Sequence, residues 1–151
     1  MEATEAKVQY PGHIAKRLRL GLAILALATL QTGAWALFAP RSWYDDFPGR
    51  GLGWIAAFGD YNEHFIQDIG NAYLAFGAVL LWAAIVLHKE AITAALLGVL
   101  VFTVPHFAIH LFVREGLSTN GYVGTLAFLT IAIALSVWLL SLSRKLTSTT
   151  L

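Results

Sequence analysis

The sequence predicts an all-α membrane protein, a four-helix transmembrane bundle, and three observations support this prediction. Of the 151 residues, 58% are hydrophobic and only 13% are charged, whereas about 25% of a soluble domain is charged. Four segments are long enough to cross the hydrocarbon core, which takes roughly 20 apolar residues in a helix. No charged residue occurs between positions 91 and 104, so a helix there has no face adapted to water.

The length of the chain allows one domain, and we expect residues 1–151 to form a single four-span membrane unit. The predicted spans cover residues 18–38, 64–87, 91–113 and 122–142. The first span follows a basic stretch and contains a small-x-small sequence, as a secretory signal peptide does. Because acidic residues precede it and its apolar stretch continues to Phe38, we expect this span to be retained.

The first external loop, residues 39–63, is the least lipid-like part of the chain. Residues 40–49 are rich in turn-forming and aromatic side chains, which suit the headgroup layer. In residues 51–59 the large apolar side chains Leu52, Ile55 and Phe58 recur at helical spacing. This pattern predicts a short interfacial helix in the first external loop, lying on the outer surface.

The second and third spans are joined by the tight turn His88-Lys89-Glu90, so they are predicted to be antiparallel neighbours. The fourth span follows a short polar loop, residues 114–121. Cytoplasmic loops accumulate Lys and Arg. With the N-terminus inside, seven of these residues are cytoplasmic and three are external. The chain is therefore expected in the cell membrane as a multi-pass protein with both termini cytoplasmic.

Several classes of function are excluded by what the sequence lacks. There is no cysteine, which excludes disulfides, thiolate metal sites and dithiol redox chemistry. No block of like charge and no basic-aromatic alternation points to a nucleic acid. The lipid bilayer is the predicted partner, and a small-molecule or lipid ligand is an open alternative. A homo-oligomer is another open alternative.

The polar residues of the predicted spans gather at the start of the second span and the end of the third. His64 and Asp68 lie four residues apart, as do His106 and His110, so each pair shares a helical face. In an antiparallel hairpin centred near residue 87, His64 lies level with His110 and Asp68 level with His106. Asn71 continues the first stripe, followed by Ala75 and Ala78. Small residues there would let the two helices approach closely.

Three hypotheses remain open for this constellation. In the first, His64, Asp68, His106 and His110 bind a divalent transition metal such as zinc, iron or copper. In the second, the same residues line a polar cavity in the extracytoplasmic half of the bundle, which holds a small-molecule or lipid ligand or relays protons. In the third, the polar side chains simply hold helices together or bind a partner subunit.

Further residues and alternatives attach to these hypotheses. Glu63, Gln67 and Asn71 are the candidate ligand-binding side chains beside the metal candidates. A membrane enzyme, such as a metal-dependent hydrolase or oxidoreductase, is the alternative function, with no catalytic residue assigned. Haem b held by two histidines, for example His64 and His110, is disfavoured because nothing else in the sequence supports it.

A resemblance to a known group rests on motifs in the first external loop and at the start of the second span. These motifs are Trp43-Tyr44-Asp45-Asp46-Phe47-Pro48-Gly49, Tyr61-Asn62-Glu63-His64 and Gln67-Asp68-Ile69-Gly70. They resemble motifs of small, uncharacterised bacterial membrane proteins grouped with the four-span DoxX-like proteins. The resemblance covers about a fifth of the chain. It implies a four-helix membrane bundle, and it implies no activity or catalytic residue.

Overall fold

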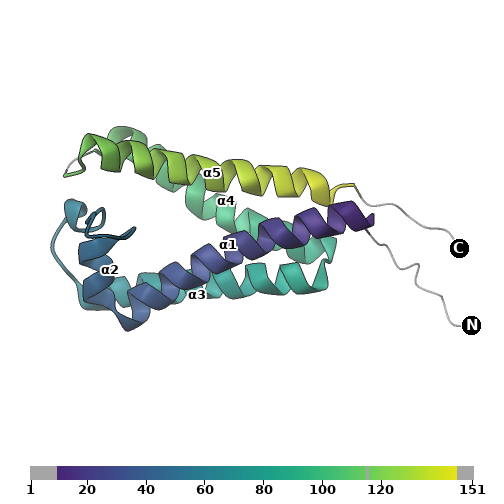
Figure 1. The fold of residues 1–151 in the computed structure, drawn as a ribbon, viewed down its shortest axis with the longest axis horizontal. Helices are drawn as coiled ribbons and strands as arrows, with labels where there is room; N and C mark the ends of the chain where they lie inside the picture. Colours follow the sequence, from purple (N-terminus) through teal and green to yellow (C-terminus); the bar gives the residue numbers. More distant parts are fainter. Residues whose placement is uncertain (1–9, 115, 146–151) are drawn as a thin grey trace, which may run out of the picture.

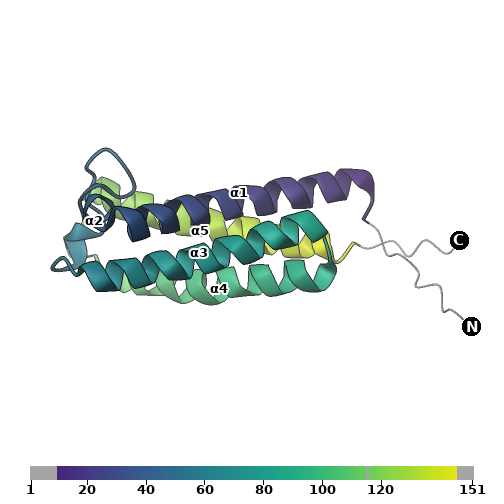
Figure 2. The ribbon, with the colours of Figure 1, turned by 90° about the horizontal axis from the view of Figure 1, so that it is seen from below.

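A computed structural model describes residues 10–114 and 116–145, which are entirely helices and their connections (Figures 1 and 2). Four of the helices are long and apolar enough to cross a membrane. The predicted fold class is therefore confirmed. The elements, in chain order, are α1 (Gly12–Phe38), α2 (Pro40–Asp46), the 3-10 turn η1 (Ala56–Phe58), α3 (Glu63–Val86), α4 (Lys89–Phe112) and α5 (Thr119–Ser143).

Local sequence signals set several helix ends. The Asn62 side chain accepts a hydrogen bond from the Phe65 backbone nitrogen at 3.0 Å, which caps the start of α3. The Ser118 hydroxyl accepts one from the Gly121 nitrogen at 3.1 Å and caps α5. At the other end of α3, Leu87 takes a left-handed conformation with φ 51°, so the chain turns sharply into α4.

The four long helices associate as two pairs, α1 with α3 and α4 with α5. Glycines bring α1 and α3 together until their backbones touch. A Cβ atom at Gly70 would lie 2.7 Å from the Leu37 nitrogen, and one at Gly33 would lie 2.8 Å from the Gly70 oxygen. Small residues allow this approach between membrane helices. We call the contact of Gly33, Ile66, Gly70 and Gly77 between α1 and α3 the glycine seam.

The two pairs meet tightly at one end of the bundle and diverge at the other. At the end that carries the described termini, here the terminal end, all four helices share one core. Its fully buried side chains are Leu18, Leu22, Leu80, Ile92, Leu96 and Leu139. At the opposite end, here the loop end, the pairs separate, and α2 and the loop after it lie there (Figure 1).

The short interfacial helix is not confirmed where we expected it. Over residues 51–59 the only helical structure is the 3-10 turn η1. Arg50, Gly51 and Gly53 have φ values of 58°, 69° and 60°, which an α-helix cannot accommodate. The seven-residue helix of this loop is instead α2, in the stretch expected to form turns.

Candidate functional site

A cavity of about 450 Å³ lies at the loop end, where the helix pairs diverge, and we call it the loop-end cavity. Three of the long helices, α3, α4 and α5, supply most of its lining, and the short helix α2 and the loop that follows supply the remainder. The lining residues are Trp43, Phe47, Trp54, Ile55, Phe58, Phe65, Ile69, Ala72, Tyr73, Phe76, Phe102, His106, His110, Thr125, Phe128 and Leu129. Most of this wall is aromatic or aliphatic.

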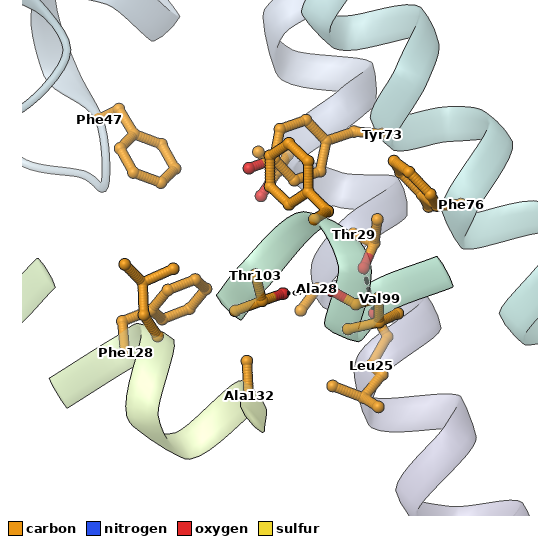
Figure 3. Close-up of a pocket in the computed structure, with 13 residues that line it drawn as sticks. Leu25, Ala28, Thr29, Phe47, Tyr73, Phe76, Val99, Thr103, Phe128 and Ala132 are labelled. Carbon is orange, nitrogen blue, oxygen red and sulfur yellow. Dashed lines mark hydrogen bonds between the residues drawn. The ribbon is translucent and has the colours of Figure 1, made fainter. Parts of the chain in front are cut away.

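A second, smaller cavity of about 90 Å³, the inner cavity, adjoins the first and adds residues from α1 (Figure 3). Six residues line both cavities, which shows that the cavities adjoin: Phe47, Tyr73, Phe76, Phe102, Phe128 and Leu129. The remaining lining residues of the inner cavity are Leu25, Ala28, Thr29, Thr32, Val99, Thr103 and Ala132. The cavities therefore extend from the loop toward the middle of the bundle.

α2 and the loop that follows it, together called the loop from here on, close the end of the loop-end cavity by bridging the two helix pairs. On one side, Trp43 is only 3% exposed and packs with Ala36 and Ile66, from α1 and α3. On the other side, the Trp54 indole lies against α5, where a Cβ atom at Gly124 would be 2.6 Å from its ring. Two tryptophans thus hold the loop over the opening between the pairs.

His106 and His110 supply ring nitrogens to this largely apolar wall. Their Nε2 atoms are 2.9 Å apart, so one ring donates a hydrogen bond and the other accepts it. The rings stack at 4.8 Å between centroids. Phe102 packs edge-on against His106, and Phe58 packs edge-on against His110. Aromatic neighbours therefore hold both rings in place.

One nitrogen of this pair has no partner. His110 is 7% exposed, and its Nδ1 atom is buried without a hydrogen bond to any described residue. A buried polar atom without a partner is costly and is uncommon in native structures. The histidine pair therefore keeps some unsatisfied hydrogen-bonding capacity at the cavity.

His64 and Asp68, the other two predicted metal ligands, lie on an exposed face of α3. Their side chains are 88% and 61% exposed, with the His64 Nε2 atom 3.6 Å from an Asp68 carboxylate oxygen. Among the ligand-binding candidates, Glu63 and Asn71 are exposed and Gln67 is half-buried. None of these five residues lines the cavities described above.

The structure therefore keeps the four predicted metal ligands as two separate pairs. Each pair is formed at the i,i+4 spacing read from the sequence. Across residues 10–114 and 116–145, no three His, Asp or Glu side chains gather closely enough to hold a metal ion. A four-ligand metal centre finds no support in this arrangement.

The rotation of α3 explains why its polar stripe misses the cavity. The glycine seam faces α1 through Ile66 and Gly70. His64 and Asp68 each precede a seam residue by two positions, which places them on nearly the opposite side of the helix. Ala75 and Ala78, expected to allow close approach to α4, are exposed.

Sequence reasoning missed the apolar stripe of α3 that does line the cavity. Phe65, Ile69, Ala72 and Phe76 line the cavity and follow the polar stripe by one residue, about 100° around the helix. The signal available in the sequence was the seven-residue spacing of Gly70 and Gly77, which places both on one face of α3. It indicates which face of α3 contacts a neighbouring helix, and hence which faces do not.

At the solvent edge of the loop end, Arg41 ties α2 to the segment before α3. Its guanidinium makes two bonds to the Asp45 carboxylate, at 2.7 and 3.1 Å, and lies 5.0 Å from the centre of the Tyr61 ring. The hydrogen bond to Asp45 raises the pKa of Arg41. This cluster is too exposed to form a binding site.

Comparison of the chain with protein-family models, with curated proteins and with solved structures gives no match. The resemblance to DoxX-like proteins stays a prediction.

Proposed function

We propose that the protein binds a lipophilic small molecule in the loop-end cavity, with His106 and His110 contacting the polar group of the ligand. The observation that supports this most is the pair of histidine rings in a wall that is otherwise largely apolar. An ionisable side chain within a membrane span is costly and commonly serves function. The site differs from the predicted one because its α3 contribution is apolar.

The size of the cavity suits a small molecule. Ligand sites usually occupy about 300–1,000 Å³ and combine an apolar lining with a few polar groups, and this cavity measures about 450 Å³. The aromatic side chains Phe58, Phe65, Phe102 and Phe128 favour a flat ring in the ligand, because aromatic groups prefer edge-on and offset-stacked neighbours.

The polar group of the ligand is best matched by a carbonyl oxygen. A neutral imidazole has one N–H donor, and a carbonyl oxygen has two lone pairs. With both Nε2 atoms protonated, the two rings can donate to one oxygen between them. Their separation of 2.9 Å must widen to about 5 Å to place that oxygen at hydrogen-bond distance from both nitrogens along its two lone pairs, so the two rings must rotate apart when the ligand binds. Without ligand, the two rings bond to each other.

A matched pair of probes tests the proposal in detergent-purified protein. 2-Acetylnaphthalene and 2-ethylnaphthalene have the same ring and nearly the same shape, but only the first has a carbonyl. Binding is followed by quenching of tryptophan fluorescence, because Trp43 and Trp54 line the cavity. We expect the acetyl compound to bind about tenfold more tightly, the effect of roughly 1.4 kcal/mol from hydrogen bonding.

Two variants separate the proposed site from the one predicted by sequence. His110→Ala should abolish the preference for the acetyl compound. His64→Ala is the matched control, because it removes a histidine from an exposed face of α3, and it should leave the preference unchanged. Equal binding of both probes to the parent protein, or loss of the preference in His64→Ala, would contradict the proposal.

A metal ion at the histidine pair is a second candidate, favoured by one distance. Two nitrogens 2.9 Å apart subtend about 90° at an ion 2.0–2.1 Å from each, an angle found in square-planar and octahedral sites. The described residues offer no third protein ligand nearby. Elemental analysis of protein purified with and without added zinc or copper decides this candidate: less than about 0.1 ion per chain would remove it.

For the orientation, we propose that the loop end is external and the terminal end cytoplasmic. Support comes from the described cations at the terminal end, Lys16, Arg17, Arg19, Lys89, Arg144 and Lys145, against Arg41, Arg50 and Arg114 at the loop end. The chain has no native cysteine, so single cysteines can report sidedness. An impermeant maleimide applied to intact cells should label Asp60→Cys and spare Lys89→Cys; the reverse pattern would invert the topology.

A further inference from the structure

We propose that the inner cavity is a second polar subsite, which binds a hydroxyl group at the far end of the same ligand. The inference rests on the proposed function and adds the class of ligand to it. That class is a neutral, lipophilic ring compound with a carbonyl at one end and a hydroxyl at the other.

The hydrogen-bonding state of two threonines carries the inference. Thr29 donates its hydroxyl proton to the Leu25 carbonyl, and Thr103 donates to the Val99 carbonyl, each at 2.6 Å. Each donor is therefore used within its own helix, and each oxygen retains a lone pair. The two threonines belong to α1 and α4, and Figure 3 shows both among the side chains around the inner cavity.

A group that these oxygens recognise must bring its own proton. A ligand hydroxyl can donate to Thr29 or Thr103, whereas a second carbonyl could accept from neither. The hydroxyls of Thr32 and Tyr73 line the same cavity and can either donate or accept. The inner cavity therefore favours a hydroxyl on the ligand, because a hydroxyl can bond to all four of these side chains and a carbonyl to only two of them.

The charge of the ligand follows from the other lining residues. Apart from the Tyr73 phenol, no side chain around the inner cavity is ionisable, and most are aliphatic or aromatic. A charged group without a counter-ion would be strongly disfavoured in such surroundings. A neutral alcohol or phenol meets both requirements, because it donates a proton and carries no charge.

The spacing along α4 sets the length of the ligand. Thr103 lies seven residues before His110, about 10 Å along the helix axis. A ring compound with polar groups at opposite ends of two fused rings covers a distance of this order. Tyr73 and Phe102, which line both cavities, pack edge-on with their centroids 5.6 Å apart. We infer that the ring lies beside this pair, where the two cavities adjoin.

The test extends the earlier probe pair by one hydroxyl group. 2-Acetyl-6-hydroxynaphthalene has the carbonyl and ring of 2-acetylnaphthalene, with a hydroxyl at the opposite end. The parent protein should bind the hydroxylated probe about five- to tenfold more tightly, the usual effect of one buried hydrogen bond. Tryptophan quenching in detergent again measures the two dissociation constants.

Thr29→Val combined with Thr103→Val removes both acceptor hydroxyls at nearly constant volume, and it should reduce the gain from the ligand hydroxyl to less than about twofold. Thr29→Ser combined with Thr103→Ser, which keeps both hydroxyls, should retain the gain. Thr130→Val is the matched control, because Thr130 makes the same bond to its own helix but lies on an exposed face of α5. It should bind both probes as the parent does.

The outcomes separate this inference from the proposed function. If 2-acetylnaphthalene binds in a His110-dependent manner but the hydroxyl adds nothing, the subsite is refuted and the ligand site stands. A hydroxyl gain that survives in the variant carrying both Thr29→Val and Thr103→Val also refutes the subsite. If both probes bind the parent and His110→Ala with the same dissociation constants, the proposed ligand site is refuted, and the subsite is refuted with it.

Discussion

The terminal end and the loop end of the bundle are formed by the same four helices but differ in how closely their side chains pack. At the terminal end, leucine and isoleucine side chains from all four helices interlock and are almost fully buried. At the loop end, the pairs diverge, and large aromatic side chains surround space that they do not fill. One end therefore provides stability, and the other is free to bind a ligand.

The loop connects the two helix pairs where they diverge. Trp43 fixes it to the α1–α3 pair and Trp54 fixes it to α5, so the opening is held by contacts at both sides. The helices themselves need not close around the cavity. A binding site placed beside a rigid core keeps its geometry, because the side chains that support it cannot relax far.

The comparison predicts its largest effect in the core of the terminal end. Leu96→Ala removes a side chain that is fully buried and should lower the free energy of unfolding by about 2–5 kcal/mol. Leu97→Ala is the matched control, because that neighbour on α4 is 49% exposed. Unfolding of detergent-purified protein, followed by circular dichroism, measures both. Equal losses would show that the terminal end is not the stabilising core.

The glycine seam should give the next largest effect. Gly70→Ala places a Cβ atom against the α1 backbone, 2.7 Å from the Leu37 nitrogen. Because backbone cannot move aside as a side chain can, we expect a loss of about 1–3 kcal/mol. Gly98→Ala is its control, since its Cβ atom would have no neighbour nearer than 3.7 Å. A neutral Gly70→Ala in the same unfolding assay would mean that α1 and α3 are not in backbone contact.

The glycine seam also marks the limit of what the sequence could predict. The helical fold was predictable because apolar segments of sufficient length with few charged residues have few alternatives in a membrane. The pairs His64–Asp68 and His106–His110 were predictable from their spacing. The rotation of α3 about its own axis was not predicted, because Gly70 and Gly77 were not recognised as the face that contacts α1. The face of α3 that lines the cavity is one residue further along the sequence than the predicted face, so His64 and Asp68 do not line the cavity.

The loop was harder to predict than the spans for a different reason. Leu52, Ile55 and Phe58 have helical spacing, but positive φ angles at Arg50, Gly51 and Gly53 prevent an α-helix across residues 51–59. Glycine permits many conformations, so the sequence did not determine that path. Its partners, Gly121 and Gly124 of α5, lie far away in the chain. The cavity depends on these contacts between distant parts of the chain, which the sequence pattern does not show.

The loop closure should be sensitive at the contact between Trp54 and α5. Gly124→Val places a branched side chain where the Trp54 indole lies 2.6 Å from a Cβ atom, so it should displace the indole. Because the terminal core is unaffected, we expect at most about 1 kcal/mol of lost stability. Binding of 2-acetylnaphthalene should weaken by about tenfold, the loss of one well-packed aromatic wall. Gly98→Ala again serves as control. An unchanged dissociation constant would show that the loop is not part of the site.

The smallest effect belongs to the exposed ion pair at the edge of the loop. Arg41→Gln removes the bonds to Asp45, whose side chain is 42% exposed while that of Arg41 is 66% exposed. Exposed pairs contribute little to stability, and less at high salt, so the small loss of stability should fall to near zero in 1 M sodium chloride. Since Trp43 and Trp54 hold the loop independently of Arg41, ligand affinity should change less than twofold. A larger, salt-independent loss of binding would mean that the Arg41 cluster, rather than the two tryptophans, holds the loop over the cavity.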